Sequence, residues 1–178
     1  MKFTSEASVK VLEYAQKRET ESRDFYRDCL GKAKIAGTRE ILKSLVADEE
    51  RHYEIVTAML DEAKSSGKAA GIDTKTPVSA KNVIEKAFPH AMTAGADFSA
   101  EAATVGQMLK TALANEKESY DNYAGAAQDA DEPELRGIYE FLAKEENRHY
   151  VLVGNLAEYL ADPGEWLYQE ENLIFRRG

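Results

Sequence analysis

The chain has 178 residues, of which 43% are hydrophobic and 31% are charged, a composition typical of one folded domain. Its net charge of −9 argues against nucleic acid or an anionic membrane as a partner and suits the attraction of cations. The single cysteine, Cys29, excludes a disulfide framework and a Cys-rich metal centre. No apolar run reaches the roughly 18 residues of a membrane span, and the N-terminal residues lack the apolar core of a signal peptide. We therefore expect a cytoplasmic protein.

Four long stretches, free of proline except for Pro133 near the start of the last, predict four helices, each about 43 Å long at 1.5 Å per residue. Residues that commonly precede or open a helix support their starts: Thr38 after Gly37, Ser99, and Asp131 with Glu134 three positions on. No stretch alternates with the period of two that marks a strand, so the sequence predicts an all-α fold. The predicted helices cover residues 5–33, 38–66, 99–127 and 131–161.

The lengths of the connections predict how these helices are arranged. The first and third connections are short, which favours antiparallel neighbours. The second connection, over residues 67–98, is long enough to cross the bundle and contains a short helical candidate over residues 79–88. We expect the second and third helices to run parallel, in an antiparallel four-helix bundle over residues 1–161 with a C-terminal tail over residues 162–178.

The sequence repeats itself at an offset of 97 residues, the offset that carries Glu19 onto Glu116. The same offset aligns Arg51-His52-Tyr53 with Arg148-His149-Tyr150 without a gap. The repeating unit is a helical hairpin, and two hairpins complete the bundle. The third histidine, His90, has no counterpart in the repeat and lies in the long connection, where we expect a surface or packing role.

Ionisable residues interrupt the apolar stripe of every helix near its middle. The second helix shows this most clearly, because Glu49 and His52 stand between Leu45 and Val56 at the spacing of one helix face. One glutamate from each helix and one histidine from two of them are therefore predicted to point inward. These six residues are Glu19, Glu49, His52, Glu116, Glu146 and His149.

Other charged residues beside these six lie off the inward stripes. Asp48, Glu50 and Glu145 are expected to face outward, where solvated charges are the default. Arg51 and Arg148 could pair with carboxylates of a neighbouring helix, but the sequence does not select the partner.

Four buried carboxylates would repel one another and need cationic partners. Two divalent ions balance their charge, and two neutral imidazoles complete the ligand set. A single Glu-x-x-His on a helix is weak evidence, because such a pair often lies on a solvated face. Here two copies occur in register, each with a glutamate 30 residues upstream. This oxygen and imidazole set suits iron, manganese or zinc.

These residues resemble the rubrerythrin-type diiron domain of the ferritin-like superfamily, whose four-helix bundle carries this ligand pattern. The match covers about residues 5–161 and includes Tyr26 and Tyr123. The resemblance implies that Glu49 and Glu146 bridge two metals and that Glu19 and Glu116 are terminal ligands. It also implies that His52 and His149 each complete one metal position.

The chain departs from rubrerythrins proper in two ways. They carry a rubredoxin-like module with four cysteines, which one cysteine excludes here, so an external electron donor such as a rubredoxin-like protein is expected. They also carry an additional glutamate one turn from the ligand of the third helix. Leu113 and Ser119 occupy the corresponding positions in this chain.

The resemblance implies a redox protein that holds two iron ions (Fe2+/Fe3+), oxo- or hydroxo-bridged when oxidised, with manganese or zinc as possible substitutes. It would reduce hydrogen peroxide, in the manner of a peroxidase, or dioxygen, and we expect a homodimer. Tyr26 and Tyr123 either donate hydrogen bonds to ligand carboxylates of the facing helix or only fill the core.

Two other functions remain open on the sequence alone. A ferroxidase that handles iron uses similar chemistry, and a dimetal-binding bundle without turnover would carry the same ligands.

Overall fold

A computed structural model describes residues 5–66, 98–131 and 133–162 of the chain. The candidate helix over residues 79–88, His90 and residues 163–178 of the tail lie outside the described residues. Four long helices are present. Three of them begin and end within a few residues of the predicted bounds, whereas the range predicted as one helix over residues 99–127 consists of three successive helical segments that begin at Phe98. In chain order the elements are α1 (Ser5–Lys32), α2 (Ala36–Ser66), α4 (Phe98–Glu101), the π-helical turn η2 (Ala102–Gly106), α5 (Gln107–Asp129) and α6 (Pro133–Ala161).

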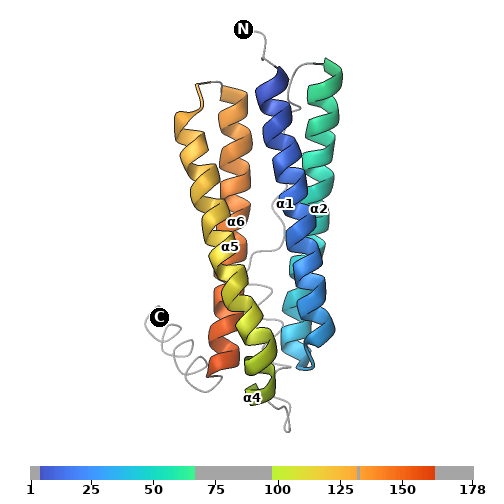
Figure 1. Ribbon diagram of the computed structural model, residues 1–178, viewed down its shortest axis with the longest axis vertical. Helices are drawn as coiled ribbons and strands as arrows, with labels where there is room; N and C mark the ends of the chain where they lie inside the picture. Colours follow the sequence, from blue (N-terminus) through green and yellow to red (C-terminus); the bar gives the residue numbers. More distant parts are fainter. Residues whose placement is uncertain (1–4, 67–97, 132, 163–178) are drawn as a thin grey trace, which may run out of the picture.

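The helices form two antiparallel hairpins that stand side by side (Figure 1). Helix α1 packs on α2, and α5 packs on α6. Helices α2 and α5 run in the same direction, as expected from a long crossover between them (Figure 1). No strand occurs in the described part of the chain, which confirms the all-α bundle. None of the helices described is long and apolar enough to cross a membrane.

The start of α2 is capped by a residue from the other hairpin. Helix α2 begins at Ala36, two residues before the expected start at Thr38, whose side chain is buried in the first turn. The carboxylate of Glu101 instead accepts hydrogen bonds from the backbone N–H groups of Lys34 and Ile35, at 2.7 and 2.9 Å. A carboxylate is favourable here because the N-terminus of a helix carries partial positive charge.

The start of α6 follows a different rule from the capping box expected at Asp131 and Glu134. The helix begins at Pro133, and Asp131 lies in the connection before it. Proline suits the first helical position because its fixed φ is helical. It lacks a backbone N–H, but an N–H at this position would have no acceptor within the helix.

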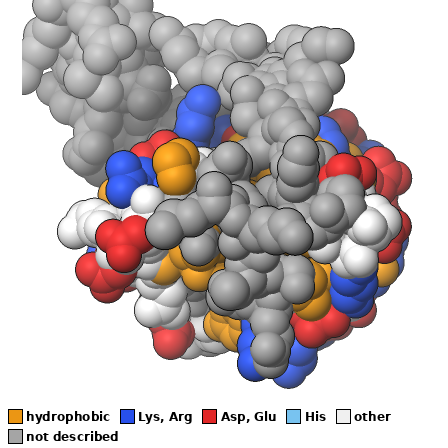
Figure 2. Space-filling view, turned by 90° about the horizontal axis from the view of Figure 1, so that it is seen from above, with side chains coloured by type: hydrophobic (Ala, Val, Ile, Leu, Met, Phe, Trp, Pro, Cys, Tyr) orange, Lys and Arg blue, Asp and Glu red, His pale blue; other side chains and the backbone are white. Residues whose placement is uncertain are grey.

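Two apolar clusters lie toward opposite ends of the bundle. One contains Cys29, Leu45 and Leu109, and the other contains Leu12, Val56 and Leu142. In the view along the bundle axis, charged side chains of both signs surround the described part of the molecule (Figure 2). The middle level of the interior, between the two clusters, holds the predicted inward-pointing ionisable residues.

Candidate metal centre

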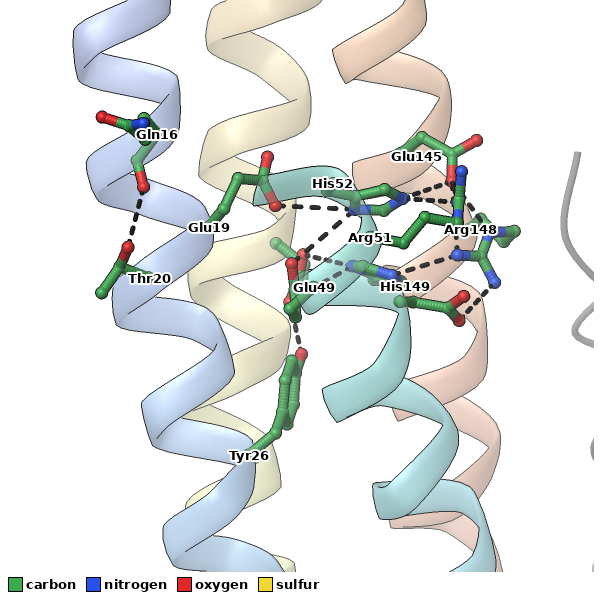
Figure 3. Close-up of polar contacts among 12 residues, drawn as sticks. Gln16, Glu19, Thr20, Tyr26, Glu49, Arg51, His52, Glu145, Arg148 and His149 are labelled. Atoms are coloured by element: carbon green, nitrogen blue, oxygen red, sulfur yellow. Dashed lines mark hydrogen bonds and ion pairs between the residues drawn. The ribbon is translucent and has the colours of Figure 1, made fainter. Parts of the chain in front are cut away.

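All six predicted ligands lie together in the interior, contributed by all four long helices. Each of the six is at most 9% exposed. In Figure 3, Glu19 of α1, Glu49 and His52 of α2, and His149 of α6 point toward one another. The pattern of one glutamate per helix with two additional histidines therefore converges on one site. The role of each residue as a metal ligand stays a prediction.

The two imidazole rings direct the same ring nitrogen at the carboxylates. His52 Nδ1 lies 3.5 Å from Glu19 Oε2 and 3.7 Å from Glu49 Oε2. His149 Nδ1 lies 3.1 Å from Glu49 Oε1 and 3.9 Å from Glu116 Oε2. The ring centroids are 5.1 Å apart. The two oxygens of Glu49 thus face different histidines.

Two overlapping groups of side chains could each hold an ion. Glu49, His52 and His149 form one group, and Glu116, Glu146 and His149 form the other, with the ligand atoms of each within 4.8 Å of one another. Glu19 belongs to neither group but contacts His52. Glu116 Oε2 is buried and has no hydrogen-bond partner, as expected of an oxygen that a cation would satisfy. This oxygen and imidazole donor set fits iron, manganese or zinc.

Burial changes the protonation of these groups. Burial raises the pKa of Glu19 to about 7 and also raises the pKa values of Glu116 and Glu146. It lowers the pKa of His149 to about 4, so that this ring is neutral at pH 7. Burial alone would lower the pKa of His52, but hydrogen bonding to Glu145, Glu19 and Glu49 raises it well above its usual value. Without a cation, the cluster therefore retains protons that a bound ion would displace.

Metal affinity is expected to fall as the pH is lowered from 7.5 to 6.0. Glu19, whose pKa burial raises to about 7, takes up a proton in this range and competes with the ion, whereas His149, with a pKa lowered to about 4, stays neutral. We expect the apparent affinity for Mn2+ to weaken by about tenfold or more, since each proton displaced costs up to about tenfold per pH unit. Calorimetric titration in two buffers of different ionisation enthalpy would count the protons released. An affinity independent of pH would contradict the expectation.

A second layer of charged residues lies between α2 and α6. The sequence placed Asp48 and Glu145 on outward faces, and this expectation is wrong, since they are only 8% and 4% exposed. His52 Nε2 lies 2.7 Å from Glu145 Oε2 (Figure 3), so we assign the Nε2 proton to this hydrogen bond. Glu145 thereby orients the ring and leaves Nδ1 toward the cluster. Burial would raise the pKa of Glu145, but His52 and the two neighbouring arginines lower it to about 2.

Two arginines of this layer pair across the hairpins. Arg51 of α2 donates to Glu145 Oε2 of α6 at 3.1 Å, and Arg148 of α6 donates to Asp48 Oδ2 of α2 at 3.0 Å. The positive charges of the two arginines balance the negative charges of the two acids, so the layer adds no net charge beside the predicted ligands. The internal repeat is the sequence signal that could have indicated this layer. Asp48 aligns with Glu145, which is also acidic, and Arg51 aligns with Arg148.

The two tyrosines singled out in the sequence differ in their contacts. The Tyr26 hydroxyl donates a hydrogen bond to Glu116 Oε1, across from α1 to α5. The Tyr123 hydroxyl is buried without a hydrogen-bond partner among the described residues, and its ring packs near Tyr139 with centroids 6.4 Å apart. Tyr26 therefore holds a predicted ligand in place, whereas Tyr123 fills the core.

Tyr26→Phe is expected to weaken metal binding, with Tyr123→Phe as its matched control. Loss of the hydrogen bond to Glu116 frees that carboxylate, and changes of this kind cost about tenfold in affinity. The same variant should lose about 1–2 kcal/mol of stability, because a buried bond to a carboxylate disappears. Tyr123→Phe removes a hydroxyl with no such bond and should retain the affinity. Metal titration and urea unfolding of both variants measure the difference, and equal effects would refute it.

Comparison with known families identifies one whose model the chain matches. A family model described as Rubrerythrin matches residues 10–157, a range that includes all six predicted ligands. The comparisons find no significant match among curated proteins or among solved structures. Because the matched range covers most of the chain and most of each long helix, the chain belongs to the rubrerythrin family, whose members are ferritin-like diiron proteins.

Proposed function

We propose that this protein is a diiron oxidoreductase that reduces hydrogen peroxide with electrons from an external donor. The observation that carries the proposal is the pair of buried carboxylate and histidine groups that share His149. The family match makes iron the expected metal at such a site. When bound there, two iron ions would supply paired one-electron redox changes and act as Lewis acids toward a bound oxidant.

The side chains of the bundle provide what this chemistry requires of a protein. The two oxygens of Glu49 face both histidines, which suits a carboxylate that bridges two ions. Glu145 fixes the ring of His52, and Tyr26 fixes the carboxylate of Glu116. The apolar clusters toward both ends of the bundle limit the access of water along its axis.

The partners of the reaction are part of the proposal. The 178 residues contain one cysteine, so the electrons would come from a separate protein, such as one of the rubredoxin type. Dioxygen is the alternative oxidant, and ferroxidase activity is the alternative outcome. Leu113 and Ser119, each one turn from Glu116, are a reason to test these alternatives, because the rubrerythrins that the sequence resembles carry an additional glutamate one turn from the ligand of the third helix. We propose that the protein works in the cytoplasm as a homodimer.

Anaerobic loading with ferrous iron, followed by stopped-flow absorbance after addition of peroxide or dioxygen, tests the proposal. We expect about two irons per chain and faster oxidation by peroxide than by dioxygen. His52→Ala and His149→Ala should lower both the iron count and the rate. Faster reaction with dioxygen that continues beyond two irons would indicate a ferroxidase, and bound iron that is not oxidised would indicate a bundle without turnover.

A further inference from the structure

The two predicted histidine ligands have different partners on the side of the ring that faces away from the cluster. His52 Nε2 lies 2.9 Å from Arg51 Nη2 and 2.7 Å from Glu145 Oε2 (Figure 3). His149 Nε2 lies 3.2 Å from Arg148 Nη2. In the described part of the chain, no carboxylate oxygen lies within hydrogen-bonding distance of His149 Nε2. Both rings therefore have a guanidinium beside them, but only His52 has a carboxylate.

This difference follows from the length of one side chain. Asp48 occupies the repeat position of Glu145 and is one methylene shorter. Its Oδ2 accepts a hydrogen bond from Arg148 Nη1 at 3.0 Å, whereas Glu145 Oε2 accepts from His52 and from both arginines of the layer. Asp48 therefore balances the charge of an arginine without serving as an acceptor for His149.

The missing acceptor matters when an ion binds. A neutral imidazole carries one proton, so an ion at Nδ1 fixes that proton on Nε2. At His52 this proton has Glu145 as its acceptor, but at His149 it would face Arg148, which can only donate. Without an ion, the His149 ring can donate from Nδ1 to Glu49 Oε1, 3.1 Å away, and accept at Nε2 from Arg148. An ion at His149 must therefore replace both hydrogen bonds of the ring, whereas an ion at His52 keeps the bond to Glu145.

We propose that the two metal positions are unequal in affinity: the position at His52 fills first, and Asp48 weakens the position at His149. Glu145 and Asp48 are then positioning residues, which set the order of loading through the two rings. The inference rests on the proposed function, because it requires ions at the predicted ligands. A partner that accepts the second ring proton orients the imidazole and raises its basicity, and such partners contribute about 10–100-fold to metal affinity.

Titration of the metal-free protein with Co2+ separates the two positions, because calorimetry resolves the binding steps and visible absorption reports the coordination of each ion. We expect two steps whose dissociation constants differ by about tenfold or more. His149→Ala should remove the weaker step, and His52→Ala should remove the tighter one. A wild type that binds two ions with equal affinity would overturn the inference and leave the proposed function intact, as would loss of the tighter step in His149→Ala. A wild type that binds no ion would overturn both.

Asp48→Glu tests the cause of the difference, because it adds the methylene that Glu145 has and Asp48 lacks. We expect it to tighten the weaker step by about three- to tenfold and to leave the tighter step unchanged. A loosened fold would weaken binding, so a gain in affinity isolates the positioning role. Asp61→Glu, at an exposed position of the same helix, is the matched control and should change neither step. An unchanged weaker step in a folded Asp48→Glu protein would overturn the role of Asp48.

Glu145→Asp makes the converse change on α6. The shorter carboxylate should lose its contact with His52 Nε2 and weaken the tighter step by about tenfold, so that the two steps move together. Glu140→Asp, at an exposed position of the same helix, should change neither step. Circular dichroism of the metal-free proteins checks that each variant is folded. A folded Glu145→Asp protein that keeps the tighter step of the wild type would overturn the role of Glu145.

Discussion

Glu49→Ala is expected to abolish stoichiometric metal binding at both positions of the centre. Its Oε2 lies 3.7 Å from His52 Nδ1 and its Oε1 lies 3.1 Å from His149 Nδ1, so one carboxylate faces both rings. Glu49 and His52 belong to the same ligand group, but Glu49 faces both rings, including that of His149, which the two groups share. We therefore expect His52→Ala to retain about one ion per chain and Glu49→Ala to retain fewer than about one, relative to about two in the wild type.

Glu50→Ala is the control for this substitution, because Glu50 is the next residue on α2 but is 47% exposed and pairs with Arg27 at the surface. It should bind as much metal as the wild type. Iron counts after anaerobic loading and desalting provide the measurement. Circular dichroism of the metal-free proteins checks that each variant is folded. A Glu49→Ala protein that is folded and holds two irons would refute a shared role for this carboxylate.

Glu145→Ala is expected to lower both stability and metal affinity, although Glu145 is not a predicted ligand. The substitution removes the acceptor of His52 Nε2 and the partner of Arg51, and it leaves the buried imidazole and the partly buried guanidinium uncompensated. Breaking a buried ion pair costs about 3–5 kcal/mol. At about 2–4 °C per kcal/mol, Tm should fall by at least about 6 °C. Loss of the residue that orients a ligand histidine should weaken metal binding by about 10–100-fold.

Two further variants separate the causes of this effect. Glu145→Gln keeps a hydrogen-bond acceptor and removes only the charge, so it should recover part of the affinity. Glu140→Ala changes an exposed acid earlier on the same helix and should shift Tm by less than about 2 °C. Thermal unfolding of the metal-free proteins and Mn2+ titration measure both effects. Similar changes of Tm and of Mn2+ affinity in Glu145→Ala and Glu140→Ala would mean that the second layer contributes neither to stability nor to metal binding.

The elements and the inward faces were accessible from the sequence because they depend on local patterns. Apolar positions at helical spacing located the four helices, and the interruption of those stripes by Glu49 and His52 indicated the site. The repeat then related His52 to His149 without knowledge of any contact. The centre is predictable in this way because each helix contributes its ligands from the same face that forms the core.

Contacts between the hairpins could not be predicted from the sequence in the same way, because they depend on packing between distant segments and not on a local pattern. Glu145 precedes the predicted ligand Glu146, and a neighbour on a helix points about 100° away, which usually means a solvated face. It is buried because α2 packs against α6 there. Thr38 was expected to begin α2, yet the capping carboxylate comes from Glu101, 66 residues from Ile35. Tyr26 and Tyr123 occupy equivalent repeat positions, and only the packing of the hairpins gives one of them a partner.

The division of the six predicted ligands between the hairpins has a kinetic consequence. Three come from α1 and α2 and three from α5 and α6, so the complete centre exists only while the hairpins are docked. The bonds from Glu101 to the link between α1 and α2 also require docking. A bound ion then stabilises contacts that form late in folding, and it slows unfolding more than it accelerates folding. The lifetime of the bound metals and the lifetime of the docked hairpins are therefore set by the same separation event.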